Sequence, residues 1–81
     1  MEDRTTEQLA QDYSAMGDSV ALINAIIAGD SMADESAADR QDCVDRNVAH
    51  LELMVAKDDW DDEDMTDAEA AVTAGQGYTA A

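Results

Sequence analysis

The sequence predicts an all-α protein: a long antiparallel helical hairpin followed by a short C-terminal helix. Three observations predict this class. Apolar residues recur at spacings of three and four along two long stretches. A glycine and a short polar segment separate the two stretches. Two Thr-x-x-Gln/Glu patterns, which are typical of helix starts, precede the first stretch and a third, shorter one. With 81 residues, the chain has room for a single small domain.

The first helix is predicted over residues 6–28. Thr5 and Gln8 have the spacing of a capping box at its start. Gly29 is suited to the left-handed conformation that ends many helices. The apolar seam consists of Leu9, Tyr13, Met16, Val20, Ile23 and Ile27, and Leu22 and Ile26 widen it.

The second helix is predicted over residues 32–57, with Ser31 as its N-cap. Its seam consists of Ala33, Ala37, Arg40, Val44, Val48, Leu51 and Val55, and Leu53 and Met54 widen it near the end. Two helices of similar length joined by a two- to three-residue turn, as predicted here, pack antiparallel. The bulky end of the first helix then faces the small residues that begin the second.

The third helix is predicted over residues 67–75 or slightly beyond. Thr66 and Glu69 form the second capping-box pattern, and Ala71, Val72 and Tyr78 provide an apolar side. Gly75 and Gly77 weaken the helix, so its end is not fixed by the sequence.

The apolar stripes of the two long helices are wider than a single partner helix covers. Such exposed stripes usually mark interfaces, so we expect a homodimer with a four-helix core. The residues expected at this interface are Leu22, Ile26, Arg40, Leu53 and Met54.

Arg40 is unusual because it occupies an apolar seam. Two interpretations remain open. Its stem can lie on the seam with the guanidinium in water. Alternatively, it can form a buried ion pair with an acid such as Asp18 or Glu35, either within the chain or across an oligomer interface. Such a pair would fix the register of the packed helices.

The net charge of −16, from 20 acids and four bases, argues against direct binding of nucleic acid or of a membrane surface, since both are anionic. Two explanations of this charge remain open. It can keep the protein soluble in saline surroundings, or it can recognise a basic partner.

Acids are densest in the stretch KDDWDDEDMTDAE at residues 57–69. Acids at the start of the third helix stabilise its N-terminus, and Trp60 is expected to fold back over the open end of the hairpin. No register of this stretch supplies the ligands of an EF-hand calcium loop. The acids without a local explanation form a candidate patch for a basic partner: Asp58, Asp59, Asp61 and Asp62.

The sequence predicts no catalytic, cofactor or metal site. Cys43 and His50 lie two turns apart on one helix, and one Cys with one His cannot complete a zinc site in a monomer. The single Cys fits a reducing compartment, and no signal peptide or membrane span is evident. We therefore expect a cytoplasmic protein that is not an enzyme.

The stretches DCVDRNVAHLELMVAKDDW (42–60) and DMTDAEAAVTAGQGYTA (64–80) resemble small uncharacterised proteins of tailed phages that infect marine cyanobacteria. The resemblance implies a viral, salt-adapted protein inside a host cell and supplies no activity. Two functional hypotheses follow. The first is a non-enzymatic interaction or structural module that acts as a homo-oligomer. The alternative is an acidic decoy whose carboxylates replace nucleic-acid phosphates in binding a basic host protein.

Overall fold

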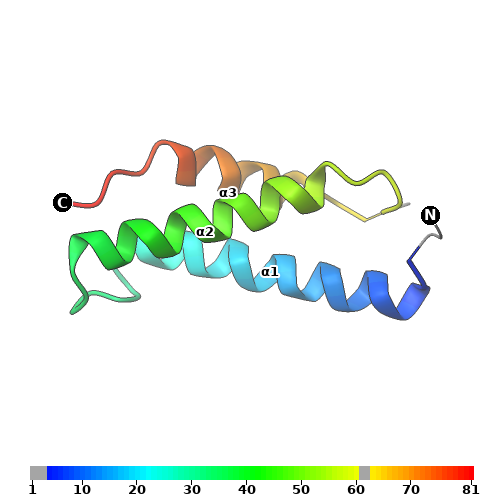
Figure 1. Cartoon of the computed structure of the whole chain (residues 1–81), viewed down its shortest axis with the longest axis horizontal. Coiled ribbons are helices and arrows are strands. Elements are labelled where there is room, and N and C mark those ends of the chain that lie inside the picture. The colour runs from blue at the N-terminus through cyan, green and yellow to red at the C-terminus, as the bar shows by residue number, and fades with distance from the viewer. Residues whose placement is uncertain (1–3, 61–62) are drawn as a thin grey trace.

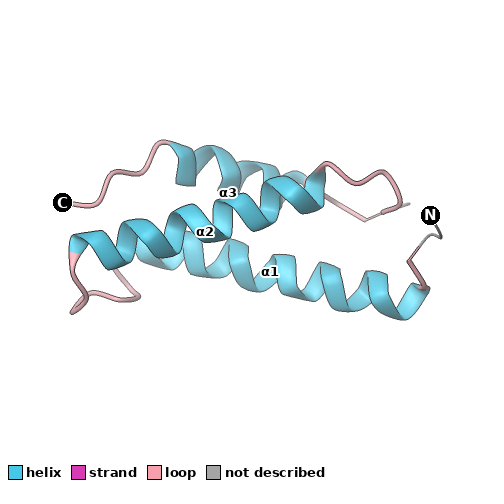
Figure 2. Cartoon of the chain, in the orientation of Figure 1, coloured by secondary structure: helices cyan, strands magenta, loops and turns pink. Residues whose placement is uncertain are grey.

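The computed structural model describes residues 4–60 and 63–81, which form three helices and, within these ranges, no strand. Helix α1 spans Thr6–Ala28, α2 spans Ala37–Val55 and α3 spans Thr66–Gln76. The chain folds into an elongated bundle in which α2 runs back along α1 and α3 runs back along α2 (Figures 1 and 2). The all-α prediction is confirmed.

Helix α1 has the predicted bounds because both of its ends are set by local contacts. Thr5 Oγ1 accepts a hydrogen bond from the Gln8 amide at 3.1 Å, and Gln8 Oε1 accepts one from the Thr5 amide at 2.8 Å. At the other end Gly29 adopts φ 82°, and the Asp30 amide donates to the Ala25 carbonyl at 2.8 Å. The predicted capping box and glycine stop are confirmed.

Helix α2 begins at Ala37 rather than at residue 32, and it ends at Val55 rather than at residue 57. Ser36, not Ser31, is the N-cap, and its Oγ accepts from the Asp39 amide at 3.1 Å. Met32 has φ 57°, a left-handed conformation that interrupts a right-handed helix. The connection is therefore a loop over residues 29–36, and the predicted two- to three-residue turn is wrong.

Helix α3 begins at Thr66, so Thr66 is its first residue and not its cap. The N-cap residue, Met65, makes no side-chain capping bond, and the predicted Thr66–Glu69 capping box is wrong. Instead, Asp64 Oδ1 accepts from the Thr66 amide at 2.9 Å. Asp64 therefore satisfies a free N–H group at the start of this helix.

Gly75 allows α3 to pack closely on the hairpin. A Cβ atom at this buried position would overlap Cγ2 of Val48 and lie 3.4 Å from Cγ1 of Val44 and 3.6 Å from Cγ2 of Ile23. The glycine that weakens the helix in isolation is therefore the residue that lets its last turn approach α1 and α2.

The core is closed within one chain. Its buried apolar residues come from all three helices and from the α2–α3 connection, namely Met16, Ile23, Ile26, Val44, Val48, Leu51, Trp60, Ala68 and Ala71. Across the described ranges, none of the helices combines the length and the apolar character that crossing a membrane requires.

Candidate functional site

Trp60 closes the end of the hairpin, as predicted. Its side chain is only 5% exposed, and its Nε1–H donates to the Met54 carbonyl at 2.7 Å. Its ring lies 6.0 Å from the ring of Tyr13, at an interplanar angle of 60°. The tryptophan thus joins the end of α2 to the first half of α1.

Arg4 covers the outer face of this tryptophan. The guanidinium carbon lies 4.2 Å from the ring centroid, within the range of a cation–π contact. The same guanidinium donates to both carboxylate oxygens of Asp59 and, at 2.7 Å, to Asp12. These hydrogen bonds from Arg4 lower the pKa of Asp59 from 3.8 to about 2 and raise the pKa of Arg4 further above its ordinary value.

The residues of the candidate acidic patch differ in their surroundings. Asp58 is exposed, as a partner patch requires. Asp59 is half-buried and paired with Arg4, so a contact that is distant in the sequence, and not local structure, accounts for its charge. Asp61 and Asp62 lie outside the described residues.

A polar cluster that sequence reasoning missed lies between α1 and α2. Ser19 is 6% exposed, and its Oγ lies 2.8 Å from Asn47 Oδ1 and 2.8 Å from His50 Nδ1. Asn47 Nδ2 donates to the Cys43 carbonyl at 2.8 Å, which fixes the orientation of the amide. Asn47 and His50 follow each other at helical spacing on α2, but nothing in the sequence identifies Ser19 as their partner.

The hydrogen positions in this cluster follow from counting donors. A serine hydroxyl has one hydrogen, and Asn47 Oδ1 can only accept, so Ser19 must donate to Asn47. His50 must then donate from Nδ1 to Ser19, so Nδ1 carries a hydrogen. In nucleophilic catalysis the histidine instead accepts the serine proton. In this structure, the cluster links α1 to α2 through Ser19.

Cys43 does not complete a metal centre with this cluster. Its Sγ lies 3.6 Å from Asn47 Nδ2, and the side chain is half-buried. Among the described residues, no three His, Cys, Asp or Glu side chains lie close enough to share a metal ion.

The residues predicted at an oligomer interface have different surroundings. Ile26 is 2% exposed, so the expectation that it remains partly exposed in a single chain is wrong. Leu22 and Met54 are half-buried and packed against the core, whereas Leu53 is 63% exposed. The sequence prediction considered the hairpin alone. In the structure, α3 and the tail after it also pack against the core and cover part of the apolar surface of α1 and α2.

Arg40 is half-buried and hydrogen-bonds to main-chain oxygens. Its Nε donates to the Glu35 carbonyl at 3.3 Å, and its NH2 group donates to the Ala81 carbonyl at 2.9 Å. Among the described residues of one chain, Arg40 forms no ion pair with Asp18 or Glu35, and a pair across an oligomer interface stays a prediction. Gln41 Oε1 accepts from the Ala80 amide at 2.8 Å, so α2 holds the C-terminal tail at two adjacent residues.

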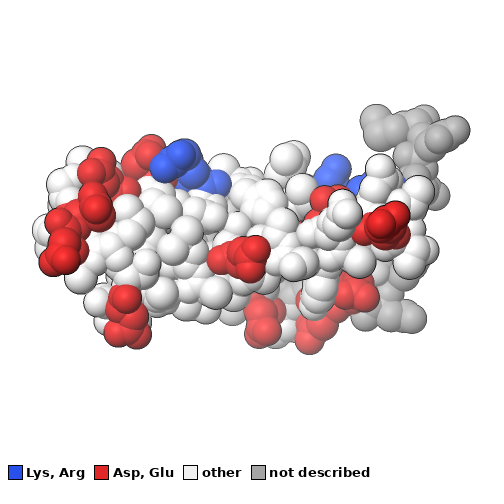
Figure 3. All heavy atoms as spheres, turned by 90° about the horizontal axis from the view of Figure 1, so that it is seen from below, with Lys and Arg blue, Asp and Glu red and all other residues white. Residues whose placement is uncertain are grey.

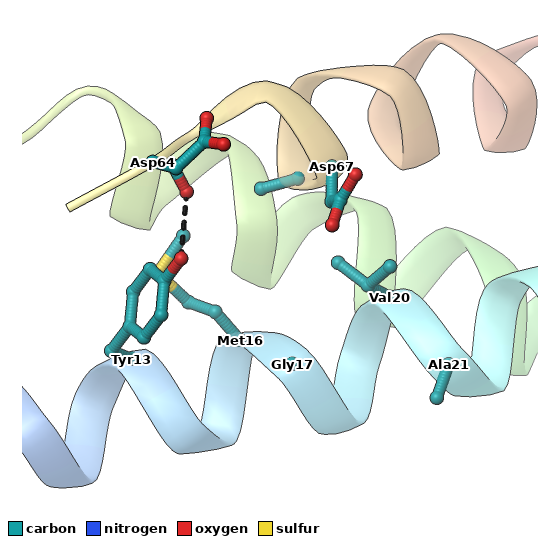
Figure 4. Close-up of a pocket in the computed structure, with 8 residues that line it drawn as sticks. Tyr13, Met16, Gly17, Val20, Ala21, Asp64 and Asp67 are labelled. Atoms are coloured by element: carbon teal, nitrogen blue, oxygen red, sulfur yellow. Dashed lines mark hydrogen bonds between the residues drawn. The ribbon is translucent and has the colours of Figure 1, made fainter.

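A groove of about 300 Å³ lies between α1 and the start of α3 (Figure 4). Tyr13 bounds one end, where its hydroxyl donates to the Asp64 carbonyl at 2.8 Å. The other lining residues are Met16, Gly17, Val20, Ala21 and Ala68, with Asp64 and Asp67 at the rim.

The two aspartates at this rim face differently. The Asp67 side chain points toward α1 near Val20, whereas the Asp64 carboxylate points away from Tyr13 (Figure 4). Hydrogen bonds from the Thr66 side chain and amide lower the pKa of Asp64. Sequence reasoning assigned both acids to helix stabilisation, and nothing in their spacing indicated a groove.

Comparisons with known proteins add no relative: no protein-family model, curated protein or solved structure matches this chain.

Proposed function

We propose that this chain is a non-enzymatic binding module that captures a basic protein through its carboxylate surface, in the cytoplasm of a host cell. The observation that carries this proposal is the imbalance of charge, 20 acids against four bases. Acidic side chains are spread over the face shown in Figure 3, with a group at the end where the α1–α2 loop lies.

Two of the three arginines lie beside acids, which reduces their contribution to the surface charge. Arg4 is paired with Asp12 and Asp59, and Arg46 is paired with Asp42 at 3.0 Å. A surface of one sign raises the association rate of an oppositely charged partner and makes binding sensitive to salt.

The test uses a fluorescent oligolysine peptide, with anisotropy measured over a series of salt concentrations. We expect binding at low salt that weakens steadily as salt rises. Absence of binding at low salt, or affinity independent of salt, refutes the proposal.

The same assay locates the contact. One variant neutralises acids that flank Trp60 in the sequence and keeps Asp59, the partner of Arg4: Asp58→Asn, Asp61→Asn and Asp62→Asn together. The control removes the same charge from exposed loop acids, as Asp30→Asn, Asp34→Asn and Glu35→Gln. A greater loss of affinity in the first variant places recognition near Trp60, and equal losses contradict that location.

A homodimer is the second candidate, and the exposure of large apolar side chains favours it. Leu53 is 63% exposed and Ile27 is 40% exposed. Sedimentation over a range of protein concentrations tests it with Leu53→Asp, and Ala49→Asp adds the same charge to another exposed position of α2. The dimer predicts dissociation by the first substitution only. A wild-type protein that stays monomeric at every concentration refutes it.

A further inference from the structure

Gly17 lines the groove between α1 and the start of α3. A Cβ atom at this position would have no neighbour within 4 Å, so neither a turn nor close packing requires glycine here. Glycine inside a helix costs about 1 kcal/mol relative to alanine. Gly75, in contrast, is required by packing. What the missing side chain at Gly17 does provide is space and accessible backbone in the groove.

The floor and the mouth of the groove differ in chemistry. Met16 and Ala68 are buried, at 2% and 5% exposure, and supply apolar atoms below the opening. At the mouth the side chain of Asp67 points into the space between the two helices (Figure 4). A volume of about 300 Å³ is at the lower end for ligand pockets, which suits one large apolar side chain.

We propose that this groove binds a single apolar side chain, such as leucine, from a basic segment of the partner protein, while Asp67 pairs with a neighbouring lysine or arginine. The inference rests on the proposed function and names the place where the basic partner is anchored. Apolar burial supplies affinity that salt does not screen, and the carboxylate orients the segment. Charge complementarity selects this occupant over a second copy of the chain, which would bring another net charge of −16 to the groove.

The experiment compares two short oligolysine peptides that differ only at a central residue, leucine in one and alanine in the other. We expect the leucine peptide to bind about tenfold more tightly, because it buries a large apolar side chain. In the amide NMR spectrum, the leucine peptide should shift the signal of Gly17 and leave that of Gly29, at the far end of α1, unchanged.

Two variants with matched controls measure separately how much the apolar floor and the charged mouth of the groove contribute to binding. Gly17→Leu fills the groove and should abolish the preference for leucine, whereas Gly17→Ala should retain most of it. Asp67→Asn should weaken binding by about two- to fivefold. Glu69→Gln removes the same charge from the same first turn of α3, outside the groove, and should have a smaller effect.

The outcomes distinguish this inference from the proposed function. Equal, salt-sensitive binding of both peptides with no shift at Gly17 overturns the groove and leaves charge-driven capture standing. Failure of both peptides to bind at low salt overturns the proposed function and the groove together.

Discussion

Two glycine-to-alanine substitutions in helices should change stability in opposite directions. Gly17 in α1 faces open space, so Gly17→Ala should gain the usual helix preference of alanine, about 1 kcal/mol. Gly75 in α3 has no such room, because the new Cβ would overlap Cγ2 of Val48. Valine in a helix has one strongly preferred side-chain rotamer, so Val48 cannot turn its methyl group aside at low cost.

The expected loss of stability in Gly75→Ala is the cost of overpacking the core minus the gain in helix preference. Overpacking a core costs about 1–3 kcal/mol. The gain in helix preference is at most about 1 kcal/mol, and Gly75 lies in the last turn of α3, where the gain is smaller. The net expectation is a destabilisation of about 1–2 kcal/mol.

Urea unfolding followed by far-UV circular dichroism measures both variants, and an unchanged denaturant slope confirms that the compactness of the end states is retained. In a protein that carries Val48→Ala the clashing methyl group is absent, so Gly75→Ala should lower the free energy of unfolding by less. A double-mutant cycle gives the coupling energy between positions 48 and 75. If Gly75→Ala stabilises the protein as Gly17→Ala does, or costs the same in both backgrounds, the close packing described for α3 is wrong.

Three further predictions concern the contacts between elements. Trp60→Ala should destabilise the protein by about 3–5 kcal/mol in urea unfolding, the cost of emptying a buried aromatic site, and a loss below about 1 kcal/mol would contradict the latch. The pKa of Asp59 is about 2 in the folded protein against 3.8 ordinarily, so its pairing with Arg4 stabilises the fold above about pH 4 and is lost as the pH falls toward 2. The stability difference between wild type and Asp59→Asn should therefore shrink over that interval, and a constant difference would contradict the pairing. Imidazole NMR should show a proton on Nδ1 of His50, and Ser19→Ala should destabilise by about 0.5–1.5 kcal/mol because it removes the hydrogen-bond partner of Asn47 Oδ1 and His50 Nδ1. A ring with a proton on Nε2 and none on Nδ1 would contradict the assignment of His50 Nδ1 as the donor to Ser19.

Helix α1 was predictable to the residue because every signal that defines it is local. Thr5 and Gln8 satisfy each other three residues apart, and Gly29 needs no distant partner to adopt a positive φ. The start of α2 was not predictable in the same way. Ser31 and Ser36 are both suitable caps, and the choice between them depends on Met32 entering the left-handed region, which its side chain does not favour.

The long-range contacts of the candidate site were beyond sequence reasoning for a different reason. Arg4 and Asp59 are 55 residues apart, and Ser19 and His50 are 31 residues apart. In a chain with 20 acids, pairing rules alone cannot select Asp59 as a partner of Arg4. Trp60 could be predicted as a latch because it is the single tryptophan at the end of a hairpin, but the ion pair that covers it depends on where the N-terminal segment lies.

The short third helix changes how the width of the apolar stripes should be interpreted. A hairpin with wide stripes must cover them, and a second copy is one way to do so. Here α3 provides the cover with small residues: Ala68, Ala71 and Gly75 are all buried, so the helix packs closely without bulky side chains of its own. An alanine-rich segment with two glycines contributes little apolar bulk to a sequence pattern, yet its small residues are what allow it to bury Ile23 and Val48. Within the described ranges, the large apolar side chains that stay exposed are Leu53 and Ile27, which lie near opposite ends of the hairpin, so the apolar surface that a dimer would cover is smaller than the stripes of the hairpin suggest.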